Sequence, residues 1–152
     1  MTSSPTYEAS DQRGTVVDVS AAGSFDTWPC HVWSSDPGIQ AVADKEKGRF
    51  RVAVGPAVVP GMHWLRVYDP TGAGALRPFV VGTFPEVAEQ EPNDEPTRAQ
   101  PITGNVVVNG KLEKSGDLDG YAVTLKKGQT LVAAVEAHSA LRSPMDGVLQ
   151  VT

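Results

Sequence analysis

The chain has 152 residues, of which 40% are hydrophobic and 7% aromatic, with 15 glycines and 12 prolines. This composition excludes a disordered chain and indicates a globular, turn-rich protein with room for one ordinary domain or two small ones. The net charge of −5 argues against a nucleic-acid-binding protein, which usually carries a basic face, so we expect no nucleic-acid partner.

The N-terminal residues 1–12 are polar and lack the apolar segment of a signal peptide. We predict a disordered tail there. No apolar run in the chain approaches the roughly 18 residues of a membrane helix, so we expect no insertion into a membrane. The single cysteine, Cys30, excludes a disulfide within the chain.

Short apolar segments separated by Gly, Pro, Asp and Asn follow in residues 13–84, and they are typical of an all-β sandwich. In "GRFRVAV" the apolar Phe50, Val52 and Val54 alternate with their neighbours, which predicts a strand with one buried face. The Pro-Gly and Asp-Pro-Thr-Gly sequences are turn formers. We predict strands at residues 14–21, 30–35, 48–54, 63–69 and 76–82.

The stretch "EVAEQEPNDEPTRAQ", residues 86–100, is the least globular part of the chain. Residues 86–119 contain eight acidic and three basic residues, which accounts for the net charge of the whole chain. This acidic segment is either a solvated linker or a site for a cation.

The strand pattern resumes after the acidic segment. Residues 105–114, "NVVVNGKLEK", contain an Asn-Gly pair, a strong hairpin signal. Residues 120–138 read as two strands joined at Lys-Lys-Gly-Gln, and "MDGVLQVT" starts a further strand. The chain is therefore predicted to be all-β, with two small β-sandwich modules in tandem at residues 13–84 and 85–152.

Motifs of catalysis are absent from the sequence: it has no Gly-x-Ser-x-Gly, no His-Glu-x-x-His and no P-loop. The histidines His31, His63 and His138 are scattered, and we expect ordinary half-buried side chains. Cys30 stands beside His31, but neighbours in a strand point to opposite faces, so we expect a buried, apolar cysteine. We expect no catalytic residue and no enzyme activity.

Oxygen ligands of the kind that calcium prefers gather in two stretches of the second half. In "EQEPND" three side chains at alternate positions lie on one side of an extended chain, and an aspartate follows. In "GDLDG" two aspartates again stand two residues apart. A calcium site requires the two stretches to meet in space; the alternative is a pair of solvated loops. The candidate ligands are Glu89, Glu91, Asn93, Asp94, Asp117 and Asp119.

Four aromatic residues of the first half, Trp28, Trp33, Trp64 and Tyr68, sit in or beside predicted strands. They could form a platform on which a carbohydrate stacks. The alternative is that they belong to the core, as aromatic residues of small sandwiches mostly do.

A series of motifs runs through residues 89–152. It consists of Glu-Pro-Asn-Asp at 91–94 with Ala and Ile at 99 and 102, G-x-L at 110–112, G-D-x-D-x-Y at 116–121, L-x-x-G-Q-x-L at 125–131 and L-x-S-P-x-D-x-x-L at 141–149. This series resembles the bacterial pre-peptidase C-terminal domain, a β-sandwich module of secreted proteases and other exported bacterial proteins. The resemblance implies an extracellular, periplasmic or cell-surface location.

In collagenases a relative of this module binds collagen, and a Glu-x-Glu-x-Asn-Asp motif there holds calcium together with later aspartates. Glu89, Glu91, Asn93 and Asp94 match that motif, while Asp117 and Asp119 fall in the later acidic turn. The resemblance thus implies calcium as the bound ion. The collagen-binding role does not carry over, because no binding face matches residue by residue.

Two further expectations come from the family patterns. The pre-peptidase pattern continues beyond the strand at 149–151, so we expect the second module to be incomplete and to self-associate through an open sheet edge. In the first module, residues 60–82 resemble the last two strands of an immunoglobulin-like domain of the type found before such modules.

The sequence therefore predicts a non-catalytic accessory module of an exported bacterial protein. It would act as a spacer, adhesion or substrate-targeting unit with a calcium-stiffened junction. The alternative is a carbohydrate- or protein-binding module that uses the aromatic face, with the acidic segment only a linker. In either case the expected partner is an extracellular protein or polysaccharide.

Overall fold

The computed structural model describes residues 10–21, 23–137, 145 and 147–152. These residues form twelve strands and no helix, so the protein is all-β as predicted. No helix long and apolar enough to cross a membrane occurs in this part of the chain. The chain divides into two compact units, one of Met1–Thr83 with Val135–Thr152 and the other of Phe84–Ala134.

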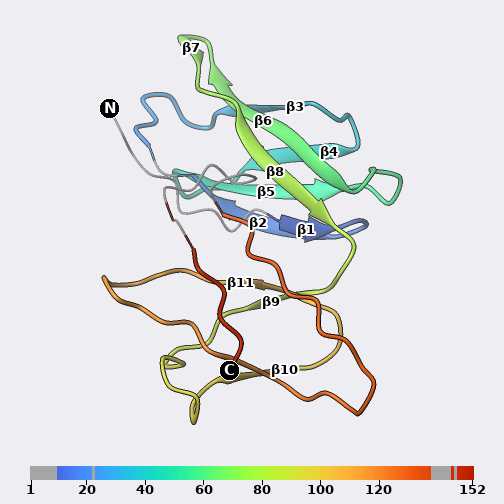
Figure 1. Cartoon of the computed structure of the whole chain (residues 1–152). Coiled ribbons are helices and arrows are strands. Elements are labelled where there is room, and N and C mark those ends of the chain that lie inside the picture. Colours follow the sequence, from blue (N-terminus) through green and yellow to red (C-terminus); the bar gives the residue numbers. More distant parts are fainter. Residues whose placement is uncertain (1–9, 22, 138–144, 146) are drawn as a thin grey trace. The chain divides into compact units, whose positions relative to one another are not determined.

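The first unit is built on one main sheet, in which every pair of neighbours is antiparallel except β1 and β8 (Figure 1). The strands follow one another in the path β1-β8-β6-β3-β4-β5-β2, and β7 pairs with β6 beside that path. Their bounds are β1 Ser10–Gln12, β2 Val16–Ser20, β3 His31–Ser34, β4 Ile39–Ala43, β5 Arg49–Val54, β6 Gly61–Asp69, β7 Gly72–Ala73 and β8 Arg77–Gly82.

The core of the first unit joins strands from opposite ends of this path. Val19 of β2 belongs to the same buried cluster as Phe79 and Val81 of β8, although several strands separate β2 from β8. The sheet must therefore curl around one core. Phe50, Val52 and Val54 of β5 are buried and alternate with more exposed neighbours, as predicted.

The turn between β1 and β2 joins the two edge strands of the path. Its Gly14 has a φ of 80°, which glycine adopts without a steric penalty. The Gly14 amide donates a hydrogen bond to the Val54 carbonyl at 2.8 Å, and the Val54 amide donates to the Thr15 carbonyl at 2.9 Å. Thus β1 and β2, which lie at opposite ends of the path, are consecutive in the sequence.

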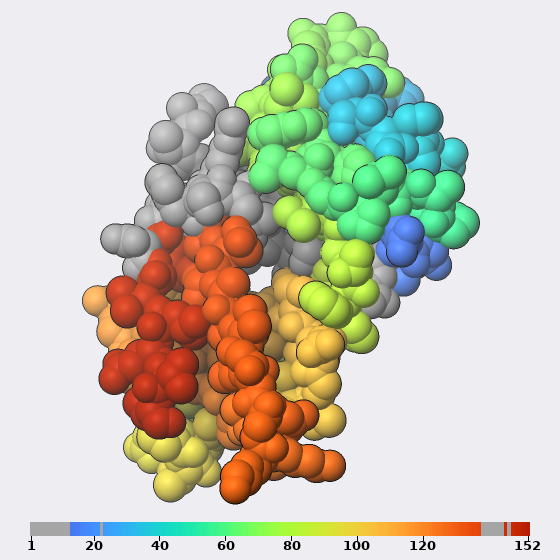
Figure 2. All heavy atoms as spheres, turned by 45° about the vertical axis from the view of Figure 1, so that its right-hand side comes forward, coloured from blue at the N-terminus to red at the C-terminus, as the bar shows by residue number. Residues whose placement is uncertain are grey.

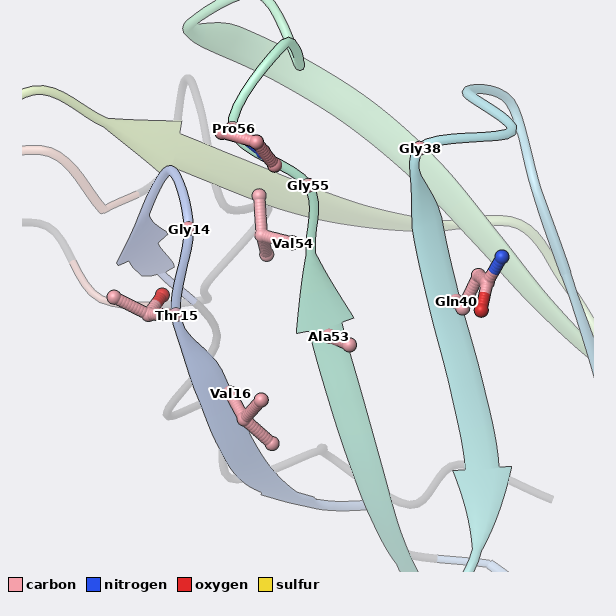
Figure 3. Close-up of a pocket in the computed structure, with 9 residues that line it drawn as sticks. All are labelled: Gly14, Thr15, Val16, Gly38, Gln40, Ala53, Val54, Gly55 and Pro56. Atoms are coloured by element: carbon pink, nitrogen blue, oxygen red, sulfur yellow. The ribbon is translucent and has the colours of Figure 1, made fainter.

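A hollow of about 420 Å³ lies at one end of β2, β4 and β5 (Figure 3). Small and apolar residues line it, with Thr15 and Gln40 as the polar side chains. None of the lining residues is titratable. The hollow therefore offers no acid, base or charged ligand group, and we place no chemistry in it.

The second unit holds four short strands in two parallel pairs. Its strands are β9 Glu86–Ala88, β10 Gln100–Ile102, β11 Val107–Asn109 and β12 Tyr121–Val123, with β11 beside β9 and β10 beside β12. A buried amide side chain supports these short strands. Gln100 donates through Nε2 to the Ala88 carbonyl at 3.0 Å, and its Oε1 accepts from the Gln90 amide at 2.9 Å.

The five strands predicted in the first half are confirmed, with ends shifted by up to two residues. The strands β4 and β7 were not predicted. Ser10–Gln12, assigned from sequence to the disordered tail, form β1, which is a correction. Residues 1–9 of that tail lie outside the described residues.

The hairpin predicted at Asn109 and Gly110 was wrong. Strand β11 ends at Asn109 and pairs with the earlier strand β9, and residues 110–114 are not in a strand. The turn at 126–129 is formed, since the Gln129 amide donates to the Lys126 carbonyl at 3.0 Å. Residues 131–137 and the described part of 145–152 are not in strands. The limits 13–84 and 85–152, the incomplete second module and its open edge remain predictions.

Candidate metal centre

The five carboxylates predicted as ligands fall into two groups that share one member. Each residue of a group offers one oxygen, and within a group these oxygens lie within 4.8 Å of one another. The first group consists of Glu89, Glu91 and Asp119; the second consists of Glu91, Asp94 and Asp117. The two acidic stretches of the sequence therefore meet in space, as a cation site requires.

Glu89 is fixed by three donors. Its Oε1 accepts from the Tyr121 hydroxyl at 2.8 Å and from Asn93 Nδ2 at 3.0 Å, and its Oε2 accepts from the Lys111 amide at 2.8 Å. Partial burial raises the pKa of this carboxyl, but the hydrogen bonds from Lys111, Asn93 and Tyr121 outweigh burial and hold the pKa below its ordinary value. Glu89 is therefore ionised at neutral pH.

Asn93, the sixth predicted ligand, is completely buried, with 0% of its surface exposed. Its backbone amide donates a hydrogen bond to Glu91 Oε2 at 2.9 Å, and its side-chain Nδ2 donates to Glu89 Oε1 at 3.0 Å. The residue thus links two carboxylates of the first group. Its Oδ1 accepts no hydrogen bond. Buried polar atoms are nearly always paired, so this oxygen is available to accept a hydrogen bond from a water molecule or to ligate a cation.

The surroundings of Asp119 disfavour the ionised form of its carboxyl. Burial, followed by the negative charges of Glu89 and Asp117, raises its pKa to about 6. Its Oδ1 is buried without a hydrogen-bond partner. A cation at this position would replace the proton that Asp119 otherwise takes up.

A close backbone contact holds the two acidic stretches together. The Gly120 amide donates to the Asn93 carbonyl at 3.2 Å, and the Gly120 carbonyl accepts from the Gln100 amide at 2.8 Å. A Cβ at position 120 would lie 2.6 Å from the Asn93 carbonyl oxygen, closer than real Cβ contacts come. Only glycine fits there without a shift of the backbone.

Sequence reasoning missed two residues of the site, Tyr121 and Lys114. Burial and the Glu89 carboxylate raise the pKa of Tyr121, so its hydroxyl stays a hydrogen-bond donor. Lys114 places its ammonium 3.0 Å from Asp94 Oδ2 and 3.5 Å from Asp117 Oδ1. Neither residue carries a ligand spacing, and only their contacts in the structure identify them.

The other candidate residues have ordinary surroundings. Cys30 is buried and donates to the Thr27 carbonyl at 3.0 Å, and burial raises the pKa of its thiol. His63 lies within 2.8 Å of the Val59 carbonyl, and the His31 ring lies against Tyr68. His138 lies outside the described residues.

The four aromatic residues do not form one platform. Trp28 contacts Phe25 and Phe50 edge-on and donates through Nε1 to the Asp44 carbonyl at 2.9 Å, which makes it a packing residue. Trp33 and Tyr68 are 49% and 42% exposed, and Trp64 is half-buried. The exposed face is therefore smaller than the sequence suggested.

Comparison of the chain with protein-family models, with curated proteins and with solved structures finds no match.

The donors of the site fit calcium. They are carboxylate and amide oxygens, which calcium prefers over nitrogen and sulfur ligands, and calcium takes six to eight of them in adaptable geometry. The unpartnered Oδ1 atoms of Asn93 and Asp119 supply two oxygens with no competing hydrogen bond. Glu89, Glu91, Asn93 and Asp119 are the residues that would hold the ion, whose charge would neutralise the crowded carboxylates.

Calcium affinity is expected to fall about tenfold between pH 7 and pH 5. Because the pKa of Asp119 is raised to about 6, this carboxyl is mostly ionised at pH 7 and mostly protonated at pH 5, where the ion must displace a proton. The stability of the calcium-free unit should change with pH in the opposite direction. Between about pH 4 and pH 6 the folded unit keeps a proton on Asp119 that the unfolded chain has lost, so the free energy of unfolding falls as the pH rises through this range.

Calorimetric calcium titrations at the two pH values check this expectation. Asp119→Asn serves as the control, because it removes the titrating group: its affinity should be lower than native at pH 7 and nearly independent of pH. An equal native affinity at pH 7 and pH 5 would contradict the assignment of Asp119 as a ligand.

Proposed function

We propose that this chain is a non-catalytic, calcium-binding accessory module of an exported bacterial protein. On this proposal both units are β-sandwich modules, the first immunoglobulin-like and the second related to the pre-peptidase C-terminal domain. Calcium at the acidic segment stiffens the junction, and the chain serves as a spacer, adhesion or substrate-targeting unit. The support for the ion is structural, while the support for export and for the families is the sequence pattern of residues 60–82 and 89–152.

The observation that carries the calcium proposal is the state of Asn93. A buried amide side chain normally satisfies both of its ends, yet the Asn93 side chain donates through Nδ2 to Glu89 and leaves its Oδ1 unpaired. An acidic surface loop has no need for a fully buried asparagine. A cation ligated by this oxygen and by the surrounding carboxylates accounts for the arrangement.

Isothermal titration of the native chain with calcium and with magnesium tests the proposal. We expect calcium to bind with a dissociation constant of roughly 10⁻⁴ to 10⁻³ M, the range of extracellular modules. Magnesium should bind much more weakly, because it demands octahedral geometry and gives up its water reluctantly. Absence of calcium binding at 10 times the upper end of this range would show that the acidic segment is a linker.

A second candidate function, binding of an acidic polysaccharide, is favoured by the exposed face of β3 and β6. Trp33 of β3 stands opposite Arg66 of β6 in the register, so these two side chains lie on the same side of the sheet. Tyr68 is two residues beyond Arg66 on β6 and therefore points to that side as well. Arg66 has no ion pair among the described residues. An arginine beside exposed aromatic rings suits a sugar ring that carries a carboxylate. In Figure 2 the atoms coloured from blue to green belong to the first unit, which contains β3 and β6.

Trp33→Ala is expected to weaken binding of polygalacturonate about tenfold or more, since aromatic residues at the centre of a binding face carry much of its affinity. Affinity electrophoresis in gels containing polygalacturonate or neutral dextran measures the effect. Leu76→Ala, which removes an exposed apolar side chain elsewhere in the unit, is the matched control. Unretarded migration of the native chain in polygalacturonate would exclude this function.

A further inference from the structure

The second carboxylate group already holds a cation that belongs to the chain. The Lys114 ammonium lies 3.0 Å from Asp94 Oδ2 and 3.5 Å from Asp117 Oδ1. The Lys114 side chain is 63% exposed, whereas that of Asp117 is 1% exposed, so the aliphatic stem lies at the surface and its charged end reaches a buried carboxylate. Among the described residues no lysine ammonium forms an ion pair with Glu89 or Asp119.

The ammonium is held close by a local turn. The Asp117 amide donates to the Lys114 carbonyl at 3.3 Å, and the Asp117 carboxylate accepts from the Glu113 amide. Lys114 and Asp117 therefore move as parts of one turn. A tethered cation of this kind is always present at high local concentration, whatever ions the solution contains.

The Lys114 ammonium offsets part of the negative charge of Asp94 and Asp117, but it leaves some of their oxygens without a hydrogen bond. Asp94 Oδ1 and Asp117 Oδ1 are buried and accept no hydrogen bond, and the 3.5 Å ion pair is at the limit of hydrogen-bond distance. An ammonium offers three protons and one charge, whereas calcium offers two charges and takes six to eight oxygens. A divalent ion that draws on Asp94 or Asp117 would lie close to the Lys114 ammonium, and the repulsion between the two positive charges favours displacement of Lys114.

We propose that Lys114 is a tethered counter-ion that competes with the divalent cation for Asp94 and Asp117 and thereby lowers the cation affinity of the second unit. Glu91 belongs to both carboxylate groups, so the competition reaches the ion held by Glu89, Glu91 and Asp119. This inference rests on the proposed calcium function and adds the residue that regulates it. Release of Lys114 from its carboxylates then accompanies ion binding.

Calorimetric titration of calcium into Lys114→Met tests the proposal. Methionine keeps the aliphatic stem and removes the charge, and we expect the dissociation constant to fall about tenfold or more. Lys111→Met is the matched control: it also removes one positive charge near the site, but Lys111 contacts the cluster only through its backbone amide. We expect its affinity to change much less, by the general charge effect alone.

Acylation of the native chain gives a second measurement. Mass spectrometry after limited treatment with acetic anhydride should show faster modification of Lys114 with saturating calcium than without it, and an unchanged rate at Lys111. Equal calcium affinities of Lys114→Met and Lys111→Met, or a Lys114 reactivity that calcium leaves unchanged, overturn the competition while native binding keeps the calcium function intact. Absence of calcium binding by the native chain and by both variants overturns both.

Discussion

Calcium at 100 times its dissociation constant should raise the free energy of unfolding of the second unit by about 2.7 kcal/mol. The gain comes from binding to the folded state alone, because the unfolded chain does not bring residues 89–94 and 117–119 together. Hydrogen exchange of amides in residues 84–134, measured with and without calcium, reports on this unit separately from the first. Protection of Gln100 and Tyr121 should increase together.

Glu91→Gln combined with Asp94→Asn should abolish this stabilisation. Glu91 is shared by both carboxylate groups and Asp94 belongs to the second, so the double variant removes charge from both. Its calcium-free form should be about as stable as the native protein, since relief of repulsion among carboxylates offsets the loss of the exposed Lys114–Asp94 ion pair. Glu95→Gln, a neighbouring exposed glutamate outside both groups, is the control and should keep the calcium effect.

The outcome that contradicts the calcium site is a double variant that calcium stabilises as much as it stabilises the native chain. A native unit whose exchange rates do not change in millimolar calcium would contradict it equally.

Gly120→Ala should destabilise the second unit by about 1–3 kcal/mol, the usual cost of forcing a methyl group into filled space. The new Cβ would meet the Asn93 carbonyl oxygen at 2.6 Å, and that oxygen belongs to the backbone and cannot rotate away. Relief of the clash requires the acidic segment to move from the turn at 117–119. Since the site needs both stretches, calcium affinity should fall about tenfold or more with stability.

Gly72→Ala provides the control for this substitution, because a Cβ at position 72 meets nothing within 4 Å and Gly72 does not have a positive φ. Denaturant unfolding and calcium titration of the two variants measure the comparison. Native calcium affinity in Gly120→Ala would show that the close contact of Gly120 with Asn93 does not position the ligands.

The strands of the first unit could be predicted where the pattern of buried and exposed residues was strong. In β5 the alternation of Phe50, Val52 and Val54 reflects one buried face, and this pattern is local. β1 has no such pattern, because its residues Ser10–Gln12 are polar and its place depends on pairing with β8, far away in the sequence. Single-sequence patterns carry no information about that pairing.

The second unit shows the same limit more sharply. The Asn-Gly pair at residues 109–110 favours a hairpin locally, yet β11 pairs with β9, and the Asn109 side chain donates to Glu86 Oε2 at 2.7 Å. For the candidate site, the carboxylate spacing pointed to residues that lie close together in the structure. It could not show that Asn93 is buried with an unpaired oxygen or that Lys114 reaches Asp94, because both facts depend on how two distant stretches meet.

The consecutive edge strands of the first unit have a consequence for folding during synthesis. Strand β1 leaves the ribosome before the other strands of its sheet, but it pairs with β8, the last strand of the path in sequence order. The sheet therefore cannot close until residue 82 has emerged, and contacts of such high sequence separation form slowly. Until β1 docks, the outer edge of β8 presents unpaired amides and carbonyls, which can accept a strand from another chain. Removal of Ser10–Gln12 would leave the outer edge of β8 without its β1 partner in the folded protein as well.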